Sequence, residues 1–330
     1  MRYAEVETFG GSEQIQFFES PDPVASEGTL LIEVQSAGIN FADVLARMGV
    51  YPSIPSAPFR PGFEIAGRVT SVGGAVNGFS VGDRVAAIML AGGGYSTHAV
   101  VAADTAIKLP PGFDYDIAAA LMVQGLTAYL VLKEAGVKKG DTVLISAAAG
   151  GLGSLAVQIS KKLGATVIGL ASKAKHKFIK ELGADVAIDY TNPGWSQSVL
   201  SATDNQGVNV YLDSQGDLEQ GAASMATLGR WFLYGARDQH ATSAPSSQFL
   251  SHVIENNIML RGYTVQSSFQ HVPLAIKDLF AWVADGSLKI DVTRYPLRDA
   301  AKAQDDFAAR KTTGKVILKP FERGTREDLR

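Results

Sequence analysis

The spacing of apolar positions along the chain changes near residue 123. Up to about Leu121 the apolar residues form short runs, such as Thr29–Val34 and Thr97–Val101, which glycine and proline turns interrupt. Such runs predict β-strands. Beyond that point, strand-like runs alternate with segments whose apolar residues recur at three- and four-residue steps, which predicts helices between the strands. This alternation is typical of a parallel, doubly wound sheet.

The second pattern predicts a complete series of elements. Helices are expected at Leu126–Glu134, Lys175–Leu182 and Pro273–Asp285, and strands at Val186–Asp189, Val208–Asp213, Arg230–Tyr234, Leu260–Val265 and Lys315–Leu318. We therefore predict an α/β fold in which a Rossmann domain, residues 123–264, interrupts a β-rich domain formed by residues 1–122 and 265–330.

The stretch Asp141–Tyr190 carries the strongest local signal. The run Thr142–Ser146 has the composition of a buried parallel strand, and the glycine-rich turn Ala147–Gly153 follows it. A helix with one apolar face comes next, and Ala165–Ala171 provides a second strand. This order of strand, turn, helix and strand predicts a dinucleotide site.

The turn is a variant of the usual glycine pattern, because Ala148 stands where the first glycine would be. We expect Gly150 and Gly151 to adopt backbone angles that other residues avoid and to let a pyrophosphate approach the chain. Gly153 would let the helix pack close to its strand, and the phosphates would lie on the helix N-terminus. The candidate cofactor contacts in the turn are Gly150, Gly151, Leu152 and Gly153. A turn of the same shape without a ligand remains an alternative.

The residues after the second strand indicate which dinucleotide fits. An Asp or Glu at this place would hold the ribose 2′-hydroxyl of NAD, but the chain has none there. It has instead Ser172, Lys173 and Lys177, whose charges suit a 2′-phosphate. The sequence therefore favours NADP over NAD, with a solvated first turn of a helix as the alternative interpretation of the lysines.

Composition limits the possible classes of protein. The chain of 330 residues is 46% hydrophobic and 19% charged, with a formal net charge of -3. Neither nucleic acid nor an anionic membrane is expected as its main partner. We find no uninterrupted apolar span near 18 residues and no charged-then-apolar leader, so we expect a cytoplasmic protein without membrane insertion.

The chain has no cysteine, which excludes disulfides, a thiol nucleophile and thiolate zinc ligands. Its five histidines are scattered and show no pair at three- or four-residue spacing: His98, His176, His240, His252 and His271. A catalytic metal is therefore not expected.

Several motifs in order resemble those of the medium-chain dehydrogenase/reductase superfamily. They are Gly38–Asp43, Pro61–Glu64, Gly82–Val85, Gly125–Ala128, Ala147–Gly153, Leu182–Ala184 and Gly314–Val316. Within the superfamily, the chain is similar to the zinc-free quinone oxidoreductases that include zeta-crystallin. The run Phe41–Asp43 with Ala46–Arg47 and Gly49–Tyr51 also resembles the vesicle amine transport protein branch.

This resemblance implies a β-rich, GroES-like substrate domain beside the Rossmann domain. In the zinc alcohol dehydrogenases of the superfamily a histidine ligand stands where this chain has Phe63, and the four-cysteine lobe has no counterpart between Val85 and Tyr95. A reaction that needs a Lewis acid is therefore disfavoured. We expect hydride transfer from NADPH to a quinone stacked on the nicotinamide in the interdomain cleft.

The resemblance also suggests roles for single residues. Asn40 and Tyr51 are candidates for contact with the acceptor, and Asp43 for orienting polar neighbours. Tyr51 could instead be a half-buried loop aromatic, and Asp43 an ordinary acid at a helix start. The remaining cofactor candidates, some of which could be simple strand-end turns, are Thr127, Tyr190, Tyr234, Gly235, Gly262 and Tyr263.

Alternative functions remain open. A reductase of α,β-unsaturated carbonyls would differ only in the shape of its acceptor, and a nucleotide-binding structural or vesicle-associated protein would show little turnover. A homodimer is expected by resemblance. The loops Tyr51–Phe59 and Asp238–Gln248 are expected to determine acceptor specificity, and Glu322–Arg330 to be a frayed terminus.

Overall fold

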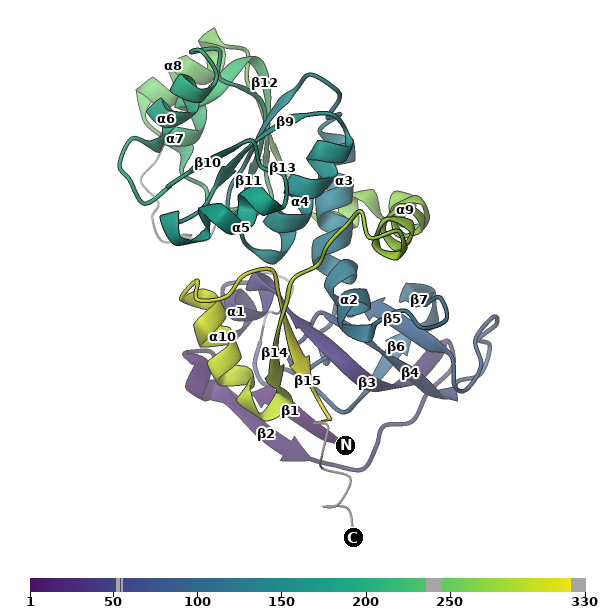
Figure 1. Ribbon diagram of the computed structural model, residues 1–330. Helices are drawn as coiled ribbons and strands as arrows, with labels where there is room; N and C mark the ends of the chain where they lie inside the picture. Colours follow the sequence, from purple (N-terminus) through teal and green to yellow (C-terminus); the bar gives the residue numbers. More distant parts are fainter. Residues whose placement is uncertain (52–53, 55, 236–244, 322–330) are drawn as a thin grey trace. The chain divides into compact units, whose positions relative to one another are not determined.

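A computed structural model describes residues 1–51, 54, 56–235 and 245–321 (Figure 1). His240, most of the expected specificity loop Asp238–Gln248, part of the loop Tyr51–Phe59 and the terminal segment 322–330 lie outside the described residues. The chain forms two compact units, one of Met1–Gln124 with Ile290–Arg330 and one of Gly125–Lys289. The fold class predicted from the sequence, a Rossmann sheet with a GroES-like β domain, is confirmed.

The second boundary between the units differs from the expected one, since it lies after Lys289 and not after residue 264. Helix α9 (Val272–Ala284) packs on helix α3 (Leu126–Glu134), which holds it in the second unit. The Tyr129 hydroxyl donates a hydrogen bond to Asp278 at 2.5 Å, and the rings of Tyr129 and Trp282 lie 5.8 Å apart. Sequence periodicity predicts the helix itself but not the surface that it covers.

The first unit is built on a seven-stranded sheet with the order β14-β15-β3-β4-β5-β7, in which β6 also pairs with β3. The strands are β3 (Thr29–Ile39), β4 (Glu64–Val72), β5 (Arg84–Ile88), β6 (His98–Ala102), β7 (Ala106–Lys108), β14 (Val292–Pro296) and β15 (Lys315–Lys319). A two-stranded sheet of β1 (Arg2–Val6) and β2 (Ile15–Glu19) and the helices α1 (Phe41–Arg47), α2 (Tyr115–Ala120) and α10 (Ala300–Ala308) complete it. Residues from both ends of the chain therefore share one sheet and one core.

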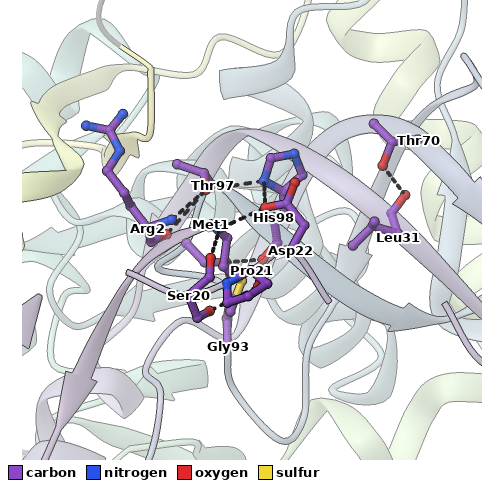
Figure 2. A network of polar contacts seen from close by, with 11 residues as sticks. Met1, Arg2, Ser20, Pro21, Asp22, Leu31, Thr70, Gly93, Thr97 and His98 are labelled. Carbon is purple, nitrogen blue, oxygen red and sulfur yellow. Dashed lines mark hydrogen bonds and ion pairs between the residues drawn. The ribbon is translucent and has the colours of Figure 1, made fainter. Parts of the chain in front are cut away.

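Polar contacts fix the start of the chain to strand β6 (Figure 2). The backbone N–H of Arg2 donates to the Thr97 hydroxyl at 3.0 Å, and Thr97 N–H donates to the Arg2 carbonyl at 2.8 Å. The Asp22 carboxylate lies 2.8 Å from the amino group of Met1 and 3.3 Å from His98 Nδ1. His98 thus has a structural surface role, as its isolated position in the sequence suggested.

The second unit is a six-stranded parallel sheet with the order β10-β9-β8-β11-β12-β13. Its strands are β8 (Thr142–Ile145), β9 (Thr166–Leu170), β10 (Val186–Ile188), β11 (Val208–Asp213), β12 (Met225–Leu233) and β13 (Met259–Gly262). All six overlap strands that the apolar runs predicted, although β12 begins five residues before the predicted start and β13 ends three residues before the predicted end. The strand order reverses at β8, which makes the edge beside β8 and β11 the topological switch point of the sheet.

Helices cover both faces of this sheet (Figure 1). Helices α4 (Gly151–Lys162) and α5 (His176–Glu181) lie on one face, and α6 (Trp195–Ala202), α7 (Leu218–Ala223) and α8 (Ser247–Glu255) on the other. The second group surrounds a buried aromatic core in which Trp231 lies between Tyr211, at 5.3 Å, and Phe249, at 6.3 Å. The sequence pattern did not predict these three helices.

The stretch Tyr115–Glu134 is helical throughout, because a π-helix (Leu121–Gly125) joins α2 to α3. By length and composition it could cross a membrane, which the sequence analysis did not anticipate because Asp116 and Gln124 interrupt its apolar residues. However, 78% of its most apolar window is buried inside the protein. A core helix passes the same test of length and hydropathy, so this stretch is weak evidence for a membrane span.

Candidate active site

The carboxyl ends of the parallel strands bring most of the predicted cofactor residues to one edge of the sheet. Ser172 follows β9, Tyr190 follows β10, Tyr234 follows β12 and Tyr263 follows β13. Thr127 is the second residue of α3 and is buried. Ligands of doubly wound sheets bind outside the carboxyl ends of the strands, near the switch point. The turn after β8 therefore stands at the expected place for a dinucleotide.

Within that turn, the packing role predicted for Gly153 is confirmed. A Cβ at Gly153 would overlap the Ala147 carbonyl oxygen, so no other residue fits there without displacement. The backbone prediction for Gly150 and Gly151 is wrong. Gly150 is extended, with φ −80° and ψ 177°, and Gly151 is the first residue of α4. The left-handed residue of the turn is Ala147, with φ 48°.

The N-terminus of α4 offers backbone donors to an anion. Gly150 is its N-cap and has no side chain to accept from the helix. The first N–H groups of a helix have no acceptor within it, and together with the helix dipole they favour phosphate. Gly151, Leu152 and Gly153 supply these groups at the switch point. The local structure therefore fits the pyrophosphate of a dinucleotide.

A cluster of hydroxyl groups joins the ends of β8, β11 and β12. Ser146 Oγ lies 3.0 Å from Ser214 Oγ and accepts from Ser214 N–H at 2.7 Å. The Tyr234 side chain hydrogen-bonds both serines, and burial raises its pKa, so the phenol stays protonated. Sequence analysis found Tyr234 but missed the serines, although Ser146 ends one predicted strand and Ser214 directly follows another.

The loop after β11 is held by the buried carboxylate of Asp213. It accepts from the N–H groups of Gln215, at 2.7 Å, and Gly216, at 3.2 Å. Burial raises the pKa of Asp213. A Cβ at Gly235 would lie 3.1 Å from the Ser214 carbonyl oxygen, so Gly235 permits a close approach of two strand ends. The backbone at this part of the edge is thus well defined.

Gly262 and Tyr263, which follow each other in the chain, differ in burial. Tyr263 is buried, and its ring makes an edge-on contact with Phe232 at a centroid distance of 6.3 Å. The structure therefore gives Tyr263 a packing role rather than an open position at the cofactor edge. Gly262 is exposed and has open space where a Cβ would be.

The lysines after β9 lie on a 3-10 turn (Lys173–Lys175) and the start of α5. The Lys177 side chain is 88% exposed, and its Nζ lies 3.8 Å from Glu181 Oε1. Asp189, the residue after β10, accepts from the N–H and the hydroxyl of Thr191, which lower its pKa. An exposed basic turn is available to a 2′-phosphate, and the same geometry also suits a solvated turn.

In the first unit, Asp43 connects helix α1 to the loop before β4. Its Oδ2 accepts from Asn40 N–H and its Oδ1 from Gly62 N–H, both at 2.8 Å. Asp43 is fully buried, and this burial raises its pKa to about 7 against the two hydrogen bonds, which lower it. The helix-start role considered for Asp43 is thus present in the capping box of α1, while its role in orienting polar groups of the acceptor site stays a prediction.

The Asn40 amide is part of a buried polar group that sequence analysis missed. Asn40 is 4% exposed, and its Nδ2 donates to Glu64 Oε1 at 2.8 Å. Its Oδ1 accepts from Lys315 Nζ at 2.9 Å, and Lys315 also forms an ion pair with Glu64. The capping box of α1 adds the N–H of Asp43 as a second donor to the Asn40 side chain, so that among the described residues only the second N–H of the amide has no partner.

Tyr51 packs against Phe63, with ring centroids 5.4 Å apart and planes at 54°. Ala46 and Ile54 belong to the same small apolar cluster. This contact supports the interpretation of Tyr51 as a half-buried loop aromatic. Among the described residues, no group of three or more His, Cys, Asp or Glu side chains is placed to hold a metal ion.

Comparison with known proteins relates both units to one superfamily. Residues 26–111 match the family described as alcohol dehydrogenase GroES-like domain, and residues 151–285 match the family described as zinc-binding dehydrogenase. A quinone oxidoreductase of Pseudomonas aeruginosa is 32% identical over 94% of this chain and 97% of its own length. The chain belongs to the quinone oxidoreductase branch of the medium-chain dehydrogenase/reductase superfamily. It is thus an oxidoreductase.

Two further relatives illustrate the range of this quinone oxidoreductase branch. The structure of Escherichia coli quinone oxidoreductase complexed with NADPH superposes with a TM-score of 0.91 at 30% identity, and covers 97% of this chain and 100% of that one. A synaptic vesicle membrane protein VAT-1 homolog of Danio rerio is 30% identical over 94% of this chain and 68% of its own length. The expected resemblance to both groups is confirmed.

Proposed function

We propose that the protein catalyses the reduction of quinones by hydride transfer from NADPH, without a metal ion. The observation that carries this proposal is the nucleotide site at the switch point of the second unit. Its turn has no space for a side chain at Gly153, and basic residues in place of an acid follow the next strand. The bound NADPH in the Escherichia coli relative supports the same cofactor here.

NADPH, when bound, supplies the hydride. The N–H groups of Gly151 to Gly153 would hold its pyrophosphate, and Ser172, Lys173 and Lys177 its 2′-phosphate. Thr127, Tyr234 and Gly235 would contact the nicotinamide half, and Tyr190 the adenine. The proposed contacts with the diphosphate use main-chain groups, so they depend on the shape of the turn rather than on particular side chains.

Quinones suit a site without a Lewis acid because both carbonyl groups of the ring can take up the charge that the hydride brings. The second N–H of Asn40 is a donor for the developing oxyanion, and preorganised donors of this kind stabilise charge at a transition state. The ring pair of Tyr51 and Phe63 offers an apolar surface to a flat acceptor. Phe63 stands where related zinc enzymes have a histidine ligand, which supports hydride transfer without zinc.

The experiment is a titration with NADPH and NADH, followed by addition of 1,4-benzoquinone and 9,10-phenanthrenequinone. We expect tighter binding of NADPH and a loss of reduced-nicotinamide absorbance that depends on the quinone. Turnover on α,β-unsaturated carbonyls but not on quinones would replace quinone reduction by enone reduction. Binding that changes nucleotide fluorescence without consumption on either class would favour a binding protein and contradict the proposal.

We further propose that the enzyme is a cytoplasmic homodimer, formed through strand β13 at the edge of the parallel sheet. All four residues of this strand are exposed. Met259 is 45% and Leu260 41% exposed, so an apolar edge with free pairing capacity is presented. Two copies of such an edge can pair across a twofold axis.

A further inference from the structure

A buried ion pair lies beside Asn40 in the first unit. Lys315, the first residue of β15, is 1% exposed, and Glu64, the first residue of β4, is fully buried. The ammonium also donates to the Ile39 carbonyl at 2.8 Å and to Asn40 Oδ1 at 2.9 Å, so all three of its donors are used. Removing two charges from water costs several kcal/mol per ion. Apolar residues of similar volume in place of a buried ion pair often leave the fold equally stable or make it more stable. The pair therefore calls for a role other than stability.

Glu64 connects this pair to a second element. Its Oε1 accepts from Lys315 and from Asn40 Nδ2, while its Oε2 accepts from the N–H of Val123 at 2.6 Å. Val123 lies within the π-helix Leu121–Gly125. Such π-helices occur mostly as single turns, frequently at functional sites. One carboxylate thus fixes both the Asn40 amide and the backbone of the π-helix.

The Ile39 carbonyl provides a second connection to the same π-helix. It accepts from Lys315 Nζ and, at 3.4 Å, from Gln124 Nε2. The space around the Glu64 carboxylate is closed on another side, because a Cβ at Gly38 would overlap it. The carboxylate therefore has little freedom to move without displacing Asn40, the π-helix or strand β3.

We propose that Lys315 and Glu64 are positioning residues for the hydride transfer, which hold the Asn40 amide and the π-helix in fixed orientation. This inference rests on the proposed function, in which Asn40 donates to the acceptor and Thr127, two residues after the π-helix, contacts NADPH. Neither Lys315 nor Glu64 touches the substrates. They act through the groups that they bind.

The test compares Lys315→Met and Glu64→Gln with Lys319→Met. Lys319 lies on the same strand and pairs with Asp116 at 2.5 Å, but has no contact with Asn40 or Glu64. We expect the first two variants to lower kcat with 1,4-benzoquinone about 10- to 100-fold, as small misplacements near a reacting centre do. The Kd for NADPH should change less than about threefold, because the nucleotide-binding residues belong to the other unit. Lys319→Met should retain kcat.

A role in folding alone makes a different prediction. In that case the double variant Lys315→Met/Glu64→Gln, which leaves no unpaired buried charge, would regain kcat together with its melting temperature. That result would overturn the proposal, as would a folded Lys315→Met enzyme with unchanged kcat. If Lys315→Met does not fold, Glu64→Gln, which keeps the shape of the side chain, carries the same comparison.

Hydrogen exchange separates failure of this inference from failure of the proposed function. The Val123 amide should exchange faster in Lys315→Met and in Glu64→Gln than in Lys319→Met or the unchanged protein. If the unchanged protein oxidises NADPH with neither quinones nor enones, the proposed function fails. Exchange at Val123 then decides whether Lys315 holds the π-helix, and equal exchange in all four proteins overturns the inference.

Discussion

At the residue scale, the glycine-rich turn shows which properties of a residue the sequence reveals. Gly153 was predicted for close packing, and the overlap with Ala147 explains why a side chain cannot be there. The sequence predicts unusual backbone angles at Gly150 and Gly151, but the residue with a left-handed backbone is Ala147. A position without room for a side chain can be predicted from its residue type, whereas the backbone angle depends on the path of the whole turn. Residue type alone therefore does not locate the strained position.

The first prediction concerns this turn. Gly153→Ala should lower the free energy of unfolding by about 1–3 kcal/mol, because the added methyl group must displace the Ala147 carbonyl. Gly150→Ala is the matched control, since its Cβ would lie 3.2 Å from the same oxygen. Urea denaturation gives the free energy of unfolding of both variants. Equal destabilisation by the two variants would contradict the packing explanation.

The second prediction concerns Asp43. Burial raises its pKa from 3.8 to about 7, so the native protein binds this proton more tightly than the unfolded chain. The stability that this group contributes is greatest below its unfolded pKa and is lost as pH rises towards about 7. In Asp43→Asn the free energy of unfolding should therefore fall less between pH 4 and pH 7 than in the unchanged protein. Urea denaturation at each pH gives the free energy of unfolding of both proteins. If it changes with pH by the same amount in both, the pKa of Asp43 is not raised and the prediction is wrong.

At the scale of elements, the apolar runs predicted all six strands of the parallel sheet and the helix that follows the turn. Helices α6 and α7 were missed because eight and six residues are too few to show a clear apolar period. Helix α8 does have an apolar face, which the sequence analysis overlooked. The partners of Asn40 were missed for another reason: Glu64 is 24 and Lys315 275 residues away along the chain. A lysine at the start of a strand, followed directly by three apolar residues, was the available signal. Its partners appear only when the sheet is assembled.

The third prediction concerns helix α5 and the turn before it. Lys177→Ala should weaken binding of NADPH by about tenfold and leave NADH nearly unchanged, because a charge-assisted contact with the 2′-phosphate is lost. Lys180→Ala, an exposed lysine of the same helix, is the control and should affect neither. Fluorescence titration gives both constants. An equal loss for NADPH and NADH would assign Lys177 to the solvated surface of the helix.

At the scale of the whole molecule, the second unit is continuous in sequence and the first is not. Sequence analysis placed the first boundary within two residues of its position after Gln124 and placed the second too early. The first boundary coincides with a change in the period of the apolar residues, which is visible in the sequence. The second lies after α9, whose assignment depends on its contact with Tyr129. Such a contact does not appear in the spacing of apolar residues along the chain.

The fourth prediction concerns assembly. Leu260→Glu should convert a dimer into a monomer, because a charge on strand β13 opposes edge-to-edge pairing. Val24→Glu, which also places a charge at an exposed apolar residue, should leave the dimer intact. Light scattering after size-exclusion chromatography gives the mass of each. A monomeric unchanged protein, or a Leu260→Glu dimer, would rule out this edge as the interface.

The discontinuity of the first unit has a consequence for synthesis on the ribosome. Strand β15, which pairs with β3 and β14, is the last strand to be translated among the residues that the structure describes. Domains fold as units during synthesis, so the parallel sheet can form before the last strand of the seven-stranded sheet has been synthesised. Until then Glu64 and Asn40 lack the ammonium that binds them both. A chain that terminates before residue 315 would thus contain all of the second unit but would lack the last strand of the first unit.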